Sequence, residues 1–138
     1  MSDASEDHPK RIDCVLIAAG KYHDIDFARL ELLKLLGEDM RFRVRVFEDY
    51  ENLEALKAAD CIVTYTCDVV PSLAAQEVLK EWLHAGGRWY ALHGTNSILR
   101  MLDDGLWDAP RWAPAFMDLL GSQFISHPPI EPYKVTVT

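Results

Sequence analysis

The sequence predicts a three-layer α/β/α domain built around a mostly parallel β-sheet. Short apolar runs, typical of strands buried on both faces, alternate along the chain with segments whose apolar residues recur at helical spacing. This alternation indicates βαβ units, in which a crossover helix joins two parallel strands. The chain has 138 residues, the usual size of one domain.

The first part of the domain contains two predicted strands and a helix. Ile12–Ala19 is an apolar run that Gly20 ends, and it predicts a strand buried on both faces. Residues 25–38 carry apolar side chains on one helical face, with Gly37 as the expected end. Phe42–Phe47 alternates between apolar residues and arginines, which predicts a strand near the sheet edge.

The middle of the chain repeats this pattern. Asp49 is the expected N-cap of a short helix that ends before the third strand, Cys61–Thr66. Pro71 suits the first turn of the next helix, and a glycine pair ends that helix before the fourth strand, Arg88–Leu92. A parallel sheet of this kind is flavodoxin-like, and it binds ligands outside the carboxyl ends of its strands.

The last third is less regular. Residues 95–114 contain Trp and Pro and leave room for one short helix, and Ala115–Leu120 is a predicted helix that Gly121 ends. Tyr133–Thr138 alternates between apolar and polar residues and starts another strand. We expect the domain to cover residues 12–138, after a disordered tail over 1–11.

Composition narrows the classes of function. The net charge of −8 opposes binding to phosphate backbones, so nucleic acid is not an expected partner. No apolar stretch approaches the ~20 residues of a membrane span, and the polar N-terminus does not resemble a signal peptide. Three cysteines without a C-x-x-C spacing give no support for a structural zinc site. These features predict a cytoplasmic protein that binds a small molecule.

Polar residues gather after the predicted strands, where a small-molecule site is expected. Histidines can transfer protons near neutral pH or bind a divalent metal such as zinc, for which three imidazoles suffice. The candidate catalytic residues are His23, His93, His127 and Asp24, and the three histidines are also the candidate metal ligands. The candidate substrate-binding residues are Gly20, Tyr22, Asp68, Gly94, Thr95, Asn96 and Trp107.

Each candidate also has a structural interpretation. Asp24 could cap the first helix, His93 could be a hydrogen-bonded core histidine, and His127 could stabilise a turn. Cys67 could be a nucleophile, but it has no basic neighbour in sequence that would lower its pKa, which favours an ordinary thiol. Trp107 and Trp112 could form a wall that stacks on a sugar, or they could cover the core.

Three motifs carry a family resemblance. They are Gly20-x-x-His23-Asp24, Ala85-Gly86-Gly87-x-x-x-x-Leu92-His93-Gly94 and Gly121-x-x-Phe124-x-x-His127-Pro128. In this order and spacing they resemble the ThuA-like (trehalose utilisation) family of the class I glutamine amidotransferase-like superfamily, from about Ile12 to the end of the chain. The resemblance implies a site on the carboxyl edge of a flavodoxin-like sheet and a substrate of the trehalose or keto-sugar type.

The sequence also departs from the family pattern in two ways. In class I amidotransferases the turn after the corresponding strand carries a nucleophilic cysteine, whereas this turn reads Leu92-His93-Gly94-Thr95, so amidotransferase activity is not expected. ThuA-like domains are usually longer, so we expect the C-terminal part of the family domain to be missing. An unfinished sheet edge favours pairing with another chain, which leaves a homo-oligomer open.

Two functions remain open. The first is a carbohydrate-metabolism enzyme that uses histidine acid–base or metal-assisted chemistry, and it requires His23, His93 and His127 to meet in one pocket. The second is a non-catalytic sugar-binding or interaction module, with no metal, lined by aromatic residues such as Tyr22, Trp107 and Trp112.

Overall fold

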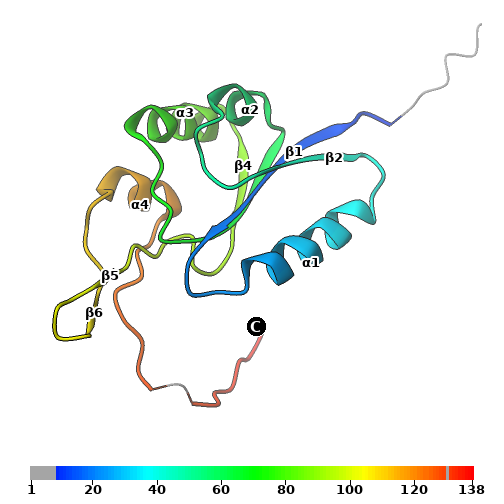
Figure 1. The fold of residues 1–138 in the computed structure, drawn as a ribbon. Coiled ribbons are helices and arrows are strands. Elements are labelled where there is room, and N and C mark those ends of the chain that lie inside the picture. The colour runs from blue at the N-terminus through cyan, green and yellow to red at the C-terminus, as the bar shows by residue number, and fades with distance from the viewer. Residues whose placement is uncertain (1–8, 130) are drawn as a thin grey trace, which may run out of the picture.

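The computed structural model describes residues 9–129 and 131–138 and has an α/β fold. Its four-stranded sheet has the order β2-β1-β3-β4, and all three strand pairs are parallel, as predicted (Figure 1). The strands are β1 (Ile12–Gly20), β2 (Phe42–Phe47), β3 (Cys61–Cys67) and β4 (Arg88–Ala91). The position of β2 at the edge confirms the interpretation of its alternating sequence.

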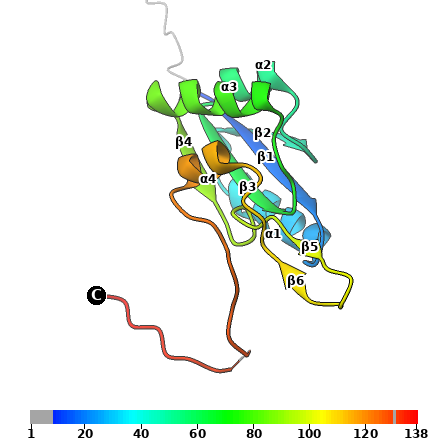
Figure 2. The ribbon, with the colours of Figure 1, turned by 90° about the vertical axis from the view of Figure 1, so that its left-hand side faces the viewer.

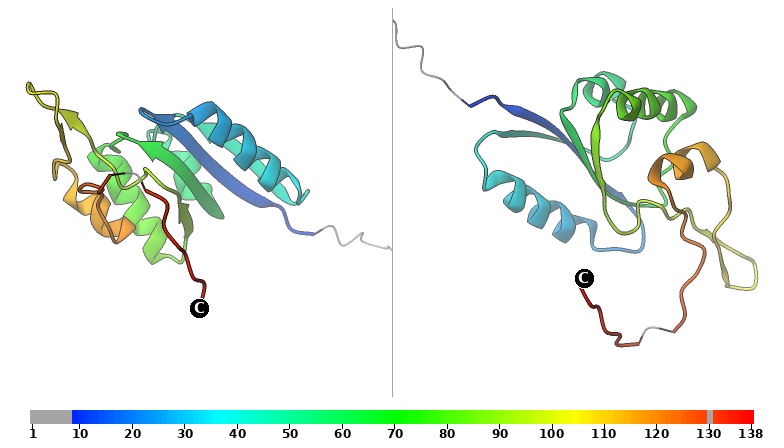
Figure 3. Two further views of the ribbon diagram at one scale, coloured as in Figure 1. Left: turned by 90° about the horizontal axis from the view of Figure 1, so that it is seen from below. Right: turned by 180° about the vertical axis from the view of Figure 1, so that it is seen from behind.

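Helices cover both faces of the sheet. Helix α1 (Ile25–Gly37) lies on one face, while α2 (Leu53–Ala58), α3 (Leu73–His84) and α4 (Pro114–Leu120) lie on the other (Figures 1 and 3). Val15, Ile17 and Ile62 point toward the α2–α4 side, and Leu16 and Val63 point toward α1. The apolar runs are therefore buried from both sides, which explains their continuous hydrophobicity.

Side-chain caps set the helix starts. Asp24, Asn52 and Ser72 each accept a hydrogen bond from the backbone N–H three residues later, at the starts of α1, α2 and α3. The prediction of Asp49 as the cap of α2 is wrong, because its carboxylate accepts from the Glu51 N–H instead. Pro71 precedes the Ser72 cap and does not lie in the first turn of α3.

The region after β4 differs from the prediction. Residues 95–114 contain a small antiparallel hairpin, β5 (Arg100–Met101) and β6 (Trp107–Asp108), which projects from the body of the domain (Figure 2). Gly105 adopts a φ of 79° in its turn, a conformation that glycine adopts without strain.

The C-terminal segment also differs. The strand predicted over Tyr133–Thr138 does not form, and the segment extends away from the sheet (Figure 2). The predicted disordered tail lies mostly outside the described residues, since the description begins at Pro9. Among the described residues, no helix is both long enough and apolar enough to cross a bilayer.

Candidate functional site

A cavity of about 600 Å³ opens at the carboxyl edge of the sheet. The chain leaves β1 toward β2 on one side and reaches β3 on the other, so the strand order reverses between β1 and β3. Ligands of open α/β sheets bind at such a position. The cavity is lined by Tyr22, His23, Cys67, His93, Ser97, Leu99, Trp107, Asp108, Phe124, Ile125, Ser126 and His127.

Two glycines let the loops around this cavity approach one another closely. Gly20 has a φ of 112°, and a Cβ there would lie 1.9 Å from the Cys67 carbonyl oxygen. Gly94 has a φ of 91°, and its Cβ would lie 2.6 Å from the Thr66 carbonyl oxygen. Both predicted substrate-binding glycines therefore serve as close backbone contacts with the end of β3.

The three candidate histidines reach the cavity from three separate segments. His23 follows β1, His93 follows β4, and His127 lies in the segment after α4. The ring centroids of His23 and His93 are 5.1 Å apart, in an edge-on arrangement. His127 lies beside Phe124, with their ring centroids 6.1 Å apart. All three candidate histidines therefore line one cavity, and the rings of His23 and His93 lie close together within it.

Hydrogen bonds define which nitrogen of two histidines is basic. His23 Nδ1 lies 3.1 Å from the Lys21 carbonyl oxygen, and His127 Nδ1 lies 2.7 Å from the Pro128 carbonyl oxygen. Because a carbonyl oxygen only accepts, each Nδ1 carries the hydrogen, and Nε2 is the nitrogen that can take up a proton. The Pro128 contact is also consistent with the turn role considered for His127, whereas the exposure of His93 contradicts a core histidine.

The two candidate aspartates have different positions. Asp24 is exposed and uses its carboxylate to accept from the Phe27 N–H, so it caps α1. With Gly20 it borders a second cavity of about 420 Å³ rather than the cavity of the three histidines. Asp68 accepts from the Leu99 N–H at 3.1 Å and from Lys21 Nζ at 2.9 Å, and the ion pair raises the pKa of Lys21.

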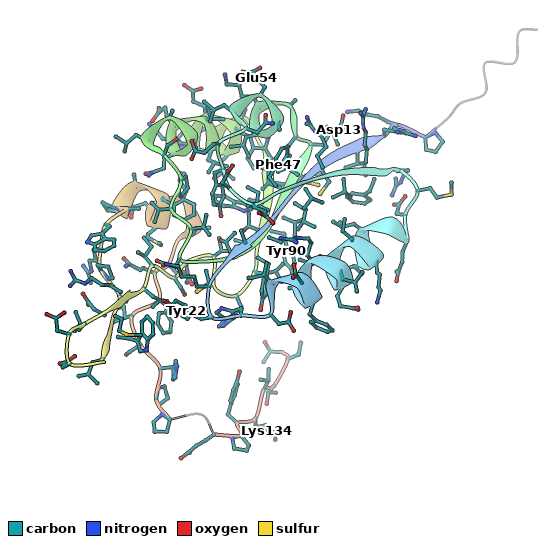
Figure 4. All side chains as sticks on the ribbon, in the orientation of Figure 1. Asp13, Tyr22, Phe47, Glu54, Tyr90 and Lys134 are labelled. Atoms are coloured by element: carbon teal, nitrogen blue, oxygen red, sulfur yellow. The ribbon has the colours of Figure 1, made fainter. Side chains whose placement is uncertain are left out.

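The remaining substrate-binding candidates divide between the cavity and the structure behind it. Tyr22 and Trp107 line the cavity and contact each other edge-on, with ring centroids 4.7 Å apart. Figure 4 shows Tyr22 at the edge of the molecule from which the β5–β6 hairpin extends. Thr95 is buried and hydrogen-bonded to Thr64, and Asn96 donates a hydrogen bond to Ser122. Neither residue lines the cavity.

Cys67 lines the cavity but is a poor nucleophile. Burial raises the pKa of its thiol above the ordinary value, and the Asp68 carboxylate adds to this effect, while Lys21 opposes it. A thiol of this kind remains protonated near neutral pH. The interpretation of Cys67 as an ordinary thiol therefore fits the structure better than a role as a nucleophile.

The described part of the chain does not form an evident metal centre. Within residues 9–129 and 131–138, no group of three or more His, Cys, Asp or Glu side chains is arranged so that it could hold a metal ion. The histidines share one cavity, but their arrangement does not fit zinc, which needs its ligand atoms about 2.0–2.3 Å from one centre.

Several lining residues were not among the sequence candidates. Phe124, Ile125 and Ser126 lie beside His127 in the third motif, and their proximity to it was an available signal. Asp108 follows Trp107 directly, but nothing in the sequence distinguished it from the other acidic residues of that segment.

Comparisons with protein-family models, with curated proteins and with solved structures find no match to this chain.

Proposed function

We propose that this chain is a ThuA-like protein of the class I glutamine amidotransferase-like superfamily, with a flavodoxin-like fold. We further propose that it acts on trehalose-type or keto-sugar substrates by histidine acid–base chemistry. The observation that most supports this proposal is the meeting of His23, His93 and His127 in one cavity at the strand-order reversal. Convergent titratable groups in a concave site are typical of active sites.

The histidines supply the chemistry in this proposal. His23, with its hydrogen on Nδ1, accepts a proton from a substrate hydroxyl at Nε2. The ring centroid of His93 lies 5.1 Å from that of His23, so His93 is placed to donate or accept a second proton on the same substrate. Proton transfer by positioned side chains typically accelerates a reaction by about 10²–10⁴-fold. The arrangement of the described residues favours this form over the metal-assisted form.

The walls of the cavity supply binding. Its volume of about 600 Å³ falls within the usual range for small-molecule sites. Tyr22 and Trp107 form an aromatic wall against which the C–H face of a sugar ring can pack. The side chains of Ser97 and Ser126 add hydroxyl groups that can donate to and accept from sugar hydroxyls.

A non-catalytic sugar-binding module is the second candidate. It is favoured by one observation: the Asp24 carboxylate caps α1 instead of orienting an imidazole, so the catalytic group expected beside His23 is missing. Such a module would use the same aromatic wall without turning over its ligand.

The test combines binding with turnover. A panel of trehalose and keto-sugars is screened by thermal shift, because a ligand that binds only the folded state raises the melting temperature. Each sugar that raises the melting temperature is then incubated with the wild type, His93→Ala and His84→Ala, and the products are measured by chromatography. His84 ends α3 and does not line the cavity, so it provides a matched control.

The outcomes separate the candidates. The enzyme predicts turnover that falls by about 10²-fold or more in His93→Ala and persists in His84→Ala. The binding module predicts a thermal shift without turnover in any variant. If no sugar in the panel shifts the melting temperature of the wild type, both carbohydrate proposals are wrong.

A further inference from the structure

Asp68 joins two loops that border the cavity, although it does not line the cavity itself. It directly follows β3, and its side chain is only 13% exposed. Its Oδ1 accepts from the Leu99 N–H at 3.1 Å, and its Oδ2 accepts from Lys21 Nζ at 2.9 Å. Its own N–H donates to the Ser97 carbonyl oxygen at 2.9 Å. Three polar groups of one residue therefore connect the loop after β1 with the segment after β4.

The loop after β1 carries His23. Lys21 is held there at two points, since its N–H donates to the Cys67 carbonyl oxygen at 3.1 Å and its ammonium group donates to Asp68. The Lys21 carbonyl oxygen in turn accepts from His23 Nδ1 at 3.1 Å. The Asp68 carboxylate is therefore connected through Lys21 to the imidazole ring of His23.

The segment after β4 carries His93. Ser97, which accepts from Asp68, donates its own N–H to the Gly94 carbonyl oxygen at 2.9 Å. Gly94 directly follows His93 in the chain. The turn that presents His93 is therefore tied to Asp68 through two consecutive backbone hydrogen bonds, and the Leu99 N–H adds a third contact to the same segment.

Backbone strain marks the same two loops. In residues 9–129 and 131–138, Tyr22 and Asp68 are the only non-glycine residues with a positive φ, of 67° and 60°. Residues other than glycine rarely adopt this conformation, and it persists where surrounding contacts hold it. Tyr22 stands between Lys21 and His23, so the contacts of Asp68 hold this conformation on both sides of the cavity edge. Such strain is concentrated at functional sites.

We propose that Asp68 is a positioning residue that sets the spacing of His23 and His93 by holding their two loops together. This inference rests on the proposed function of the two histidines as acid and base. Asp68 acts through the loops and not on the substrate. The ring centroids of the two histidines are 5.1 Å apart, so both rings can reach one substrate only while the loops keep their places. A misplacement of about 1 Å can cost about 10²-fold in rate.

Three variants isolate the contact between Asp68 and Lys21. Asp68→Asn keeps an oxygen that can accept from Leu99 and tolerates the positive φ, but it turns an amide N–H toward the ammonium group. Lys21→Met removes the contact from the other partner, and it changes a side chain that is 63% exposed, so the fold is retained. Lys21→Arg keeps a cationic donor and is the conservative rescue.

Asp60→Asn is the matched control. Asp60 directly precedes β3, at the end of the strand opposite to Asp68. Its carboxylate is used in the same way, since it accepts from the Asp13 N–H at 2.8 Å and pairs with Lys10 at 3.7 Å. It does not line the cavity. The control therefore removes an equivalent pair of contacts away from the histidines.

Two measurements are made on each full-length variant. The first is the nuclear Overhauser effect between the ring protons of His23 and His93, recorded without a ligand, because the two rings lie edge-on to each other. The second is turnover of trehalose and of each keto-sugar in the panel. Asp68→Asn and Lys21→Met should lose the Overhauser effect and should lower turnover by about tenfold or more. Asp60→Asn should retain both signals, and Lys21→Arg should restore most of each. A merely structural role would lower the melting temperature without separating the two rings.

The outcomes distinguish this inference from the function beneath it. If the Overhauser effect is the same in the wild type, Asp68→Asn and Lys21→Met, whether present or absent, the inference is wrong and the proposed function stands on its own turnover data. The inference is also wrong if Asp60→Asn loses the effect equally, or if the effect is lost while turnover is unchanged. If the wild type converts no sugar, the proposed enzyme fails, and the Overhauser comparison still decides whether Asp68 sets the spacing of the rings.

Discussion

The face of the sheet under α2, α3 and α4 buries fifteen residues of the described chain in one cluster, whereas the face under α1 buries four. Helix α1 itself contains no buried residue, although it is the longest helix of the structure. Helix α3, of nearly the same length, buries residues such as Leu79 and Trp82 and donates the indole N–H of Trp82 to the Ala59 carbonyl. Buried apolar side chains therefore contribute more to holding the α2–α4 layer on the sheet than to holding the α1 layer.

The α1 layer depends more on polar contacts at its surface. Arg29 joins α1 to the Ala18 carbonyl and to Glu48, and Asp24 caps its first turn. Tyr90, on the same face of the sheet as Val63, remains 62% exposed. Since surface ion pairs contribute little to stability and buried apolar area contributes most, we infer that the α2–α4 face dominates the free energy of unfolding.

The largest expected effect tests this asymmetry directly. Leu79→Ala removes a fully buried side chain from α3 and should lower the free energy of unfolding by about 2–5 kcal/mol. Leu35→Ala in α1 removes a side chain that is 60% exposed and should change it by at most about 0.5 kcal/mol. Urea unfolding followed by circular dichroism measures both. Equal losses in the two variants would contradict the comparison.

The asymmetry also explains how much of the fold could be predicted. β1 and β3 are apolar runs long enough to be recognised, and the alternation of β2 placed it correctly at the edge. The β5–β6 hairpin was missed because two-residue strands have no periodicity, although its Asp-Gly pair, Asp104-Gly105, is a turn signal. The strand predicted at Tyr133 was wrong because an alternating sequence becomes a strand only when it has a partner.

The site was predictable where it depends on strand ends. Parallel strands deliver their carboxyl ends to one edge, so His23 and His93 could be expected to lie together from sequence alone. The use of each carboxylate could not be predicted in the same way. Asp24 and Asp68 both follow strands, yet local geometry commits the first to a helix cap and the second to a bridge between loops.

The second prediction compares caps on the two faces. Asp24→Ala and Ser72→Ala each remove the side chain that accepts from the first turn, of α1 and α3 respectively. Each should cost about 0.5–2 kcal/mol in urea unfolding. In Asp24→Ala we expect sugar binding and turnover to persist once the loss of stability is allowed for. Loss of turnover at unchanged stability would instead assign Asp24 a catalytic role.

The smallest effect concerns the turn between α1 and β2. Hydrogen bonds from the Arg41 side chain, and then from its backbone N–H, lower the pKa of the partly exposed Asp39 carboxyl to about 2. An unfolded chain would have an ordinary aspartate pKa of about 3.9, so the folded state favours the ionised form. This contribution to stability is present above about pH 4 and is lost as the pH falls through the folded pKa of about 2.

Thermal unfolding of the wild type and Asp39→Asn between pH 2 and pH 5 tests this prediction. The wild type should melt slightly higher at pH 5, and the difference should shrink steadily toward pH 2 as the carboxylate of Asp39 is protonated. Asp103→Asn, an exposed aspartate of the hairpin turn, serves as the control and should show no such trend. A difference that stays constant with pH would mean that the Asp39–Arg41 pair does not stabilise the turn. The stability of the α1 layer would then owe nothing to this pair, and would have to come from the Arg29 contacts, the Asp24 cap and the four buried sheet residues beneath α1.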